Sequence, residues 1–97
     1  MSSEVSLSLK LKVFTPDSLL ADEDVQEISL PGVEGYLGIL PGHCPILVAL
    51  GMGKLSYRWL HREESFFIKG GYAEVLPDRV IVFSRINKDN DGKLYEG

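Results

Sequence analysis

The pair His43-Cys44 is the place in the chain where an imidazole adjoins a thiol. Together these groups are the parts of a nucleophilic site, in which a base activates the thiol. Adjacent residues on an extended chain point in opposite directions, so the two side chains are not expected to meet. We expect Cys44 to be a small buried or half-buried residue, and we expect the chain to carry no catalytic residues.

His43 has two interpretations that the sequence leaves open. Its ring follows Gly42 and stands near a proline on either side, Pro41 and Pro45. In this position it can hydrogen-bond a nearby carbonyl and hold the turn. A half-exposed imidazole between prolines is equally suited to contacting another protein.

Metal ligands are too scattered to predict a metal site. The other histidine, His61, lies far from His43 in the sequence, and no Cys-x-x-Cys or His-x-His pair occurs. Asn87, Asp89 and Asp91 have the spacing of the first half of a calcium loop. The chain ends before the glutamate that completes such a loop, so we interpret these residues as a solvated polar segment.

A phosphate-binding loop is not predicted either. Gly53-Lys54 matches the end of such a loop only superficially, because Val48 occupies the position of its first glycine. Leu55 stands where a Ser or Thr is needed. We therefore interpret the glycines as turn residues and expect no cofactor.

Length and composition describe one small globular domain. The 97 residues are 44% hydrophobic and 25% charged, and the net charge of −4 provides no basic surface for nucleic acid. The single cysteine excludes an internal disulfide. No run approaches the roughly 20 apolar residues of a membrane-spanning helix, and the amino terminus lacks the basic residues of a targeting segment. Any membrane association is therefore expected to come through a partner.

Alternation of apolar and polar residues predicts strands along most of the chain. From Val5 to Val13 every second residue is aliphatic, which is typical of a strand with one buried face. A second strand is expected to start at Leu19–Ala21, to be interrupted by the acidic run Asp22–Asp24, and to resume over Val25–Leu30. A helix over Asp22–Ile28 is the only competing interpretation.

Turn signals divide the rest of the chain. They are Pro31-Gly32, Gly51–Gly53, the polar link His61–Glu64, Gly70-Gly71 and Pro77-Asp78. This spacing predicts an all-β fold, a small β-sandwich or flattened barrel of about eight to ten short strands. Residues 1–86 are assigned to this domain, and residues 87–97 are expected to form a polar, flexible tail.

One stretch, Gly35 to Leu50, concentrates glycines and prolines between apolar residues. Its pattern Gly-x-x-Gly-Ile-x-Pro-Gly-His-x-Pro-Ile-Leu resembles the signature of the epsilon subunit of F-type ATP synthases, in the amino-terminal β-sandwich of that subunit. The resemblance extends from about Leu9 to Ser84. Further motifs with matching order and spacing are Leu11–Pro16, Ile28–Gly35, Gly51–Leu55, Lys69–Val75 and Val80–Ser84.

The resemblance implies a rotor subunit of an ion-translocating synthase with no active site of its own. It implies two direct partners, the gamma subunit and the membrane-embedded c-ring, and the catalytic head as an indirect one. A membrane is reached only through the complex, and because the sequence shows no transit peptide we expect it to be a prokaryotic plasma membrane, on its cytoplasmic side, rather than a thylakoid or mitochondrial membrane.

By position, the resemblance assigns two contact segments. Those expected at the c-ring are Glu34, Gly35 and Tyr36, and those expected at the gamma subunit are Leu40, Gly42, His43 and Pro45. An exposed apolar patch near these residues is therefore expected.

Two departures from the family change what is expected. The position of Tyr36 is often acidic in the family, so the ring contact should involve packing or hydroxyl bonding rather than an ion pair. The family commonly continues into a carboxyl-terminal pair of helices that regulates ATP hydrolysis and in some members binds ATP. Nothing after Ser84 resembles that pair, so inhibition and ATP sensing are not expected of this chain.

The alternative function is a free-standing β-sandwich that binds peptide or carbohydrate. It would require a concave aromatic groove, for which Tyr57, Trp59 and Phe67 are the candidates. We expect these residues, with Phe66 and Tyr72, to be core or hairpin-facing side chains instead.

Overall fold

Seven strands occupy residues 8–86, the part of the chain that the computed structural model describes, and no helix occurs there. The strands are β1 (Leu9–Phe14), β2 (Leu19–Val25), β3 (Glu27–Gly32), β4 (Gly35–Ile39), β5 (Ile46–Trp59), β6 (Arg62–Leu76) and β7 (Arg79–Ile86). The all-β prediction is confirmed, and the competing helix over Asp22–Ile28 is not formed. The start of the first predicted strand and the predicted tail at 87–97 lie outside the described residues.

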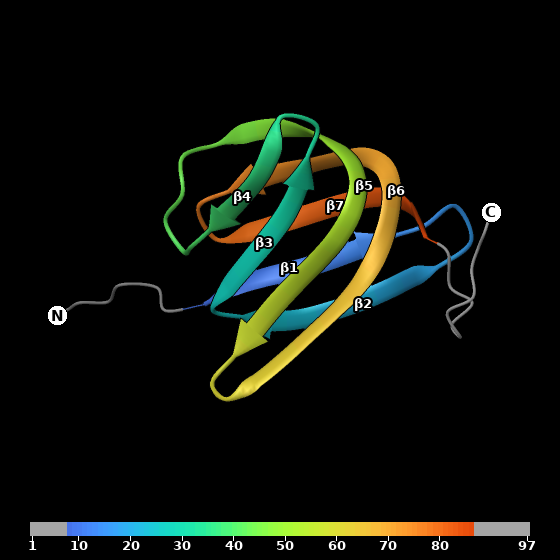
Figure 1. Cartoon of the computed structure of the whole chain (residues 1–97). Helices are drawn as coiled ribbons and strands as arrows, with labels where there is room; N and C mark the ends of the chain where they lie inside the picture. Colours follow the sequence, from blue (N-terminus) through green and yellow to red (C-terminus); the bar gives the residue numbers. More distant parts are fainter. Residues whose placement is uncertain (1–7, 87–97) are drawn as a thin grey trace, which may run out of the picture.

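The strands form one hydrogen-bonded sheet in the order β2-β1-β7-β6-β5-β3-β4. Neighbouring strands are antiparallel except β1 and β7, which run parallel. Figure 1 shows this sheet folded over itself, with β3 and β4 in front of β7 and β1. The fold is therefore the predicted sandwich, and its two layers belong to one continuous sheet.

β5 and β6 are long because they run through both layers. They pair without a register shift from Ile46–Val75 to Trp59–Arg62. β6 bends at Gly70 and Gly71, whose φ angles are +77° and +117°, a backbone region that is open to glycine and strained for other residues. The glycines that were expected to separate short strands therefore bend long ones, and the sheet has seven strands rather than about eight to ten.

The acidic run Asp22–Asp24 lies inside β2 and does not interrupt it, contrary to the prediction. Asp22 and Asp24 stand opposite Lys12 and Lys10 of β1, and the Lys10 Nζ lies 3.0 Å from Asp24 Oδ1. Opposite charges that face each other across two strands stabilise the pairing. The strand ends instead after this run, between β2 and β3.

Two turns lie beside the residues predicted to form them. Pro31 and Gly32 are the last residues of β3, and the turn follows at Val33-Glu34. The loop between β5 and β6 is Leu60-His61, shorter than the predicted link His61–Glu64. This short loop is possible because Leu60 adopts a φ of +57°.

Leu60→Gly is expected to raise the free energy of unfolding by about 0.5–1 kcal/mol. Left-handed backbone costs a non-glycine residue roughly 1–2 kcal/mol, and the extra chain entropy of glycine offsets roughly 0.5–1 kcal/mol of that gain. Urea denaturation measures the difference. His61→Gly, at the neighbouring loop position, is the control, and equal gains in both variants would mean that strain at Leu60 is not the cause.

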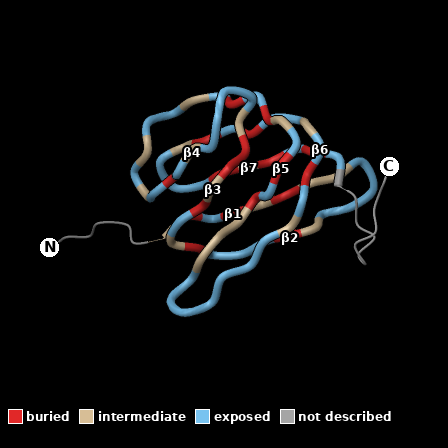
Figure 2. Tube along the Cα trace, in the orientation of Figure 1, coloured by how far each residue is buried: buried red, intermediate tan, exposed pale blue. Residues whose placement is uncertain are grey.

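The core lies between the two layers, where Figure 2 shows the buried segments facing one another. Each strand contributes to it, and inner residues alternate with outer ones along β1 as predicted. The largest completely buried aliphatic residues are Leu9, Leu11, Val13, Val25, Ile28, Leu30, Ile39, Leu55, Ile68, Val75, Val80 and Val82.

Candidate functional site

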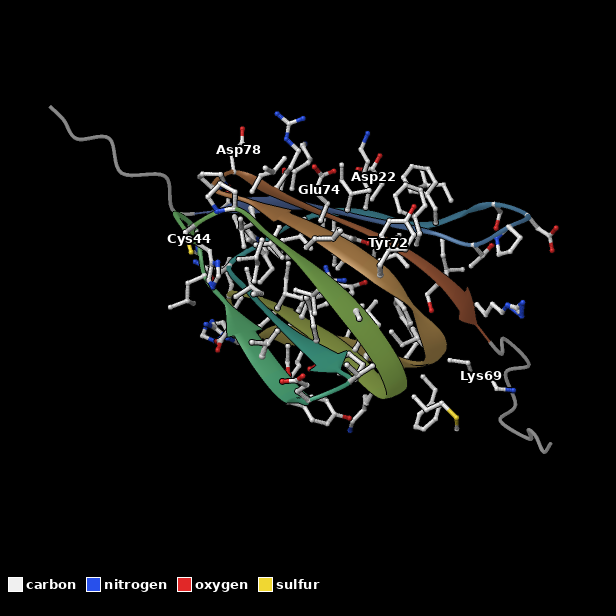
Figure 3. The ribbon with its side chains drawn as sticks, turned by 90° about the horizontal axis from the view of Figure 1, so that it is seen from above. Asp22, Cys44, Lys69, Tyr72, Glu74 and Asp78 are labelled. Atoms are coloured by element: carbon white, nitrogen blue, oxygen red, sulfur yellow. The ribbon has the colours of Figure 1, made fainter. Side chains whose placement is uncertain are left out.

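The His43-Cys44 pair lies in the connection between β4 and β5. Cys44 is exposed, so the prediction of a buried or half-buried thiol is wrong: the connection runs over the surface at the end of the sandwich (Figure 3). The Nδ1 of His43 lies 2.8 Å from the carbonyl oxygen of Cys44 and donates a hydrogen bond to it. This contact confirms that His43 bonds a nearby carbonyl, and its roles in holding the turn and in a protein contact stay predictions.

No group of three or more His, Cys, Asp or Glu side chains that could hold a metal ion occurs in residues 8–86. Within the same residues there is also no helix with the length and apolar character needed to cross a membrane. The candidate site is therefore sought among exposed surfaces that could bind another protein.

One backbone hydrogen bond fixes the connection between β4 and β5 to the rest of the sandwich, and a second closes the connection itself. The N–H of Gly42 donates to the carbonyl of Pro77 at 2.8 Å, and the N–H of His43 donates to the carbonyl of Leu40 at 3.2 Å. Gly42 has a φ of +88°, which a side chain would disfavour. This turn therefore presents Leu40 and Pro45 to solvent in a defined geometry.

The turn between β3 and β4 is fixed in a similar way. The N–H of Val33 donates to the carbonyl of Ala49 in β5 at 3.0 Å. Gly35 has a φ of +130° and begins β4 directly after the turn. Glu34 at the tip and Tyr36 in β4 are consequently exposed.

These two segments lie at opposite ends of β4. β4 has five residues, and at about 3.4 Å per residue the segments are separated by about 15 Å. The predicted c-ring residues and the predicted gamma-subunit residues therefore form two separate surfaces, both along the edge strand of the sheet.

Two exposed apolar residues near these surfaces, Val33 in the β3–β4 turn and Leu47 in β5, were not predicted from the sequence. The exposed fractions are 63% for Val33, 61% for Tyr36, 55% for Leu40 and 71% for Leu47. Val33, Tyr36 and Leu47 also line one groove between the β3–β4 turn and the start of β5. Exposed apolar groups gathered in this way are typical of protein-binding surfaces. Leu47 was missed because it belongs to the uniformly apolar run at 46–50, in which periodicity does not reveal the outward face.

The aromatic residues that the alternative peptide or carbohydrate site would need are divided between the core and the surface. Tyr57 packs edge to face against Phe66, with ring centroids 6.5 Å apart. Both rings pack against the core, as predicted for hairpin-facing residues. Trp59 and Phe67 are exposed.

A second aromatic cluster, which sequence spacing did not reveal, lies on the outer face of the layer formed by β1, β7 and β6. The Phe83 ring lies 5.3 Å from that of Phe14 and 5.2 Å from that of Tyr72, centroid to centroid. Figure 3 shows Tyr72 on the side of this layer that faces away from β3 and β4. The three rings come from three strands, so only the sheet order brings them together.

Two ionisable groups of the described residues have a shifted pKa, and neither belongs to the two surfaces along β4. A hydrogen bond to Asp24 raises the pKa of Lys10 because it favours the charged ammonium. Partial burial raises the pKa of the Tyr57 phenol, and the charges of Glu23 and Glu64 raise it further. Both shifts keep the ordinary charge state at neutral pH, so these groups support the fold rather than acid–base chemistry.

Comparison with known proteins gives a family. The family model described as the beta-sandwich domain of the ATP synthase Delta/Epsilon chain matches residues 8–86. The ATP synthase epsilon chain of Solibacter usitatus is 42% identical over 79 residues, which are 81% of this chain and 59% of that protein. The epsilon chain of Lawsonia intracellularis is 43% identical over 77 residues, 79% of this chain and 58% of that protein. The chain thus spans little more than half the length of these relatives.

Solved structures give the same fold at lower identity. A chain in the mitochondrial ATP synthase of Euglena gracilis, solved as OSCP, F1 and c-ring, aligns with a TM-score of 0.77 at 24% identity over 87% of this chain and 54% of that one. A chain in the central stalk and c-ring of the Tetrahymena thermophila mitochondrial enzyme aligns with a TM-score of 0.68 at 19% identity over 91% of this chain and 80% of that one.

Proposed function

Because the chain belongs to the ATP synthase delta/epsilon family through its β-sandwich domain, we propose that it works as the epsilon subunit in the central stalk of an F-type ATP synthase. In this role it couples rotation of the c-ring to the gamma subunit and performs no catalysis itself. The observation that carries the proposal is the family match over the whole described domain, residues 8–86.

The two surfaces along β4 supply a separate contact for each direct partner. The c-ring contact is formed by Glu34, Gly35 and Tyr36, and the gamma-subunit contact by Leu40, Gly42, His43 and Pro45. Their separation along one strand supports this assignment, because one surface can face the ring while the other faces the stalk. The hydrogen bond from Gly42 to Pro77 supports it too, since a surface that transmits torque must be held firmly to its domain.

The subunit is placed at the cytoplasmic face of a prokaryotic plasma membrane, which it reaches through the c-ring. The bacterial sources of its relatives support this location. The catalytic head is an indirect partner, reached through the gamma subunit.

A pulldown with the full chain as bait tests the proposal. The wild-type chain is expected to recover the gamma subunit and the c-ring from detergent-solubilised synthase. His43→Ala is expected to reduce recovery of gamma severalfold, because it removes both the half-buried imidazole and its hydrogen bond to the carbonyl of Cys44. Tyr36→Asp is expected to reduce recovery of the c-ring, because it puts a charge in place of an exposed aromatic ring.

Matched controls come from the same residue types elsewhere on the surface. His61 lies in the β5–β6 loop, and Tyr72 lies on the outer face of the other layer. The variants His61→Ala and Tyr72→Asp should therefore recover the partners as the wild-type chain does. A folded wild-type chain that recovers neither gamma nor the ring would contradict the proposal and favour a free-standing binding module.

A further inference from the structure

Tyr36 makes an unusual contact for an exposed residue of an edge strand. It pairs with Pro31 of β3, yet its side chain reaches across β3 to β5. There its hydroxyl oxygen accepts a hydrogen bond from the backbone N–H of Lys54 at 3.0 Å. A side chain thus links two strands that are not neighbours in the sheet.

The N–H of Lys54 is available because the ladder between β3 and β5 is interrupted. Ser29 pairs with Ser56 and Gly32 pairs with Leu50, with a register shift between them. The residues of β5 at 51–55 therefore face only two residues of β3, one of which is Pro31. A strand N–H without a backbone acceptor needs another partner or water, and the Tyr36 hydroxyl supplies one.

Gly53 leaves the space that this contact needs. A Cβ at Gly53 would lie 2.6 Å from the Tyr36 hydroxyl oxygen and 2.8 Å from the Cβ of Pro31, both shorter than real Cβ contacts. Leu30 points into the core, so its neighbour Pro31 faces the other side of the sheet. Pro31 is nevertheless buried. The tyrosine, the proline and the glycine therefore fit together as one unit, which we call the Tyr36 clamp.

We propose that Tyr36 is a positioning residue, which fastens the β3–β4 turn to β5 through the Tyr36 clamp and so orients the surface that meets the c-ring. This inference rests on the proposed function. The hydroxyl oxygen receives the Lys54 N–H, so its own proton stays free to be donated outward. At this surface Tyr36 presents an uncharged aromatic ring beside the exposed carboxylate of Glu34, and the ring fits a partner loop that offers apolar groups and an uncharged acceptor such as a backbone carbonyl.

Amide hydrogen exchange of the full chain tests the clamp without any partner. Tyr36→Phe keeps the ring and removes the acceptor, so the Lys54 amide is expected to exchange about tenfold faster. The amide of Lys10, which donates to the carbonyl of Asp78 in the other layer, should be unchanged. Tyr72→Phe removes a hydroxyl from the opposite layer and should leave Lys54 unchanged.

Gly53→Ala tests the clamp from the other side. The added methyl group would displace the Tyr36 hydroxyl while leaving it in the chain, so the Lys54 amide should again exchange faster. Gly38→Ala is the matched control, because a Cβ at that position of β4 meets nothing within 4 Å.

Recovery of the c-ring by Gly53→Ala, which displaces the Tyr36 hydroxyl without removing it, then tests the positioning role beside Tyr36→Phe, and a severalfold loss is expected of both variants. Unchanged exchange at Lys54 would overturn the proposal. Faster exchange with wild-type recovery of the ring would also overturn it, because the clamp would then serve stability alone. If the wild-type chain recovers no ring, the proposed function fails and the positioning role fails with it, while the exchange data still report whether the clamp forms.

Discussion

Gly71→Ala is expected to destabilise the domain by roughly 2–6 kcal/mol, the sum of the cost of overpacking and the cost of backbone strain. A Cβ at Gly71 would overlap the carbonyl oxygen of Phe83 and lie 2.8 Å from the Cα of Ser84. Both contacts are with backbone, which cannot move aside without breaking the pairing of β6 with β7. The φ of +117° adds strain for any residue with a side chain.

An effect of this size is a large part of the stability of a small domain, which is about 5–15 kcal/mol in total. Chemical denaturation followed by circular dichroism measures it. Gly38→Ala is the control, since its site is open and its φ lies outside the left-handed region; it should change stability by no more than about 1 kcal/mol. Similar denaturation midpoints for the two variants would mean that the bend of β6 adapts to a side chain.

Strand positions were predictable from the sequence wherever one face of a strand is buried. β1 is the clearest case, because Leu9, Leu11 and Val13 are buried while Lys10 is exposed. The acidic strand β2, which pairs with β1, was wrongly predicted to be interrupted because its charged residues were interpreted as an exposed corner. The pairing with Lys10 and Lys12, which makes those charges favourable, depends on a neighbour that the local pattern does not identify.

Strand length was not predictable from glycine positions. Glycine is expected in turns, in bulges and wherever two backbones approach closely, and a single sequence does not distinguish these uses. Gly51, Gly53, Gly70 and Gly71 lie within strands and serve the bend and the Tyr36 clamp. The prediction of separate short strands therefore failed where the sheet folds over.

The candidate surfaces were found through the family resemblance, since no residue type in them indicates chemistry. The structure adds what spacing could not show: Val33 and Leu47 flank the turn, and the Tyr36 hydroxyl meets a backbone N–H that is 18 residues away in the sequence. That contact depends on the register shift between β3 and β5. It became visible only when the pairing of both strands was known.

Leu30→Ala is expected to lower the free energy of unfolding by about 3 kcal/mol, within the usual range for a buried leucine. Leu30 is completely buried and points into the core from β3, where it pairs with Leu37 of β4. Removing its side chain leaves a cavity between two close-packed layers, which adds to the loss of apolar burial. Leu47→Ala, the same change at an exposed position of β5, should cost less than about 1 kcal/mol.

The Leu30 and Tyr36 variants should differ in how many strands show faster hydrogen exchange, as well as in how much stability they lose. Leu30 lies on the inner face of β3, whereas the neighbouring Pro31 lies under the Tyr36 ring on the outer face. Leu30→Ala should therefore speed hydrogen exchange of the most protected amides in every strand, because these exchange through global unfolding. Tyr36→Phe should speed exchange mainly at Lys54. If Leu30→Ala changed exchange in β3 and β4 alone, those strands would unfold separately, and the two layers could not form the single rigid body that the proposed transmission of torque requires.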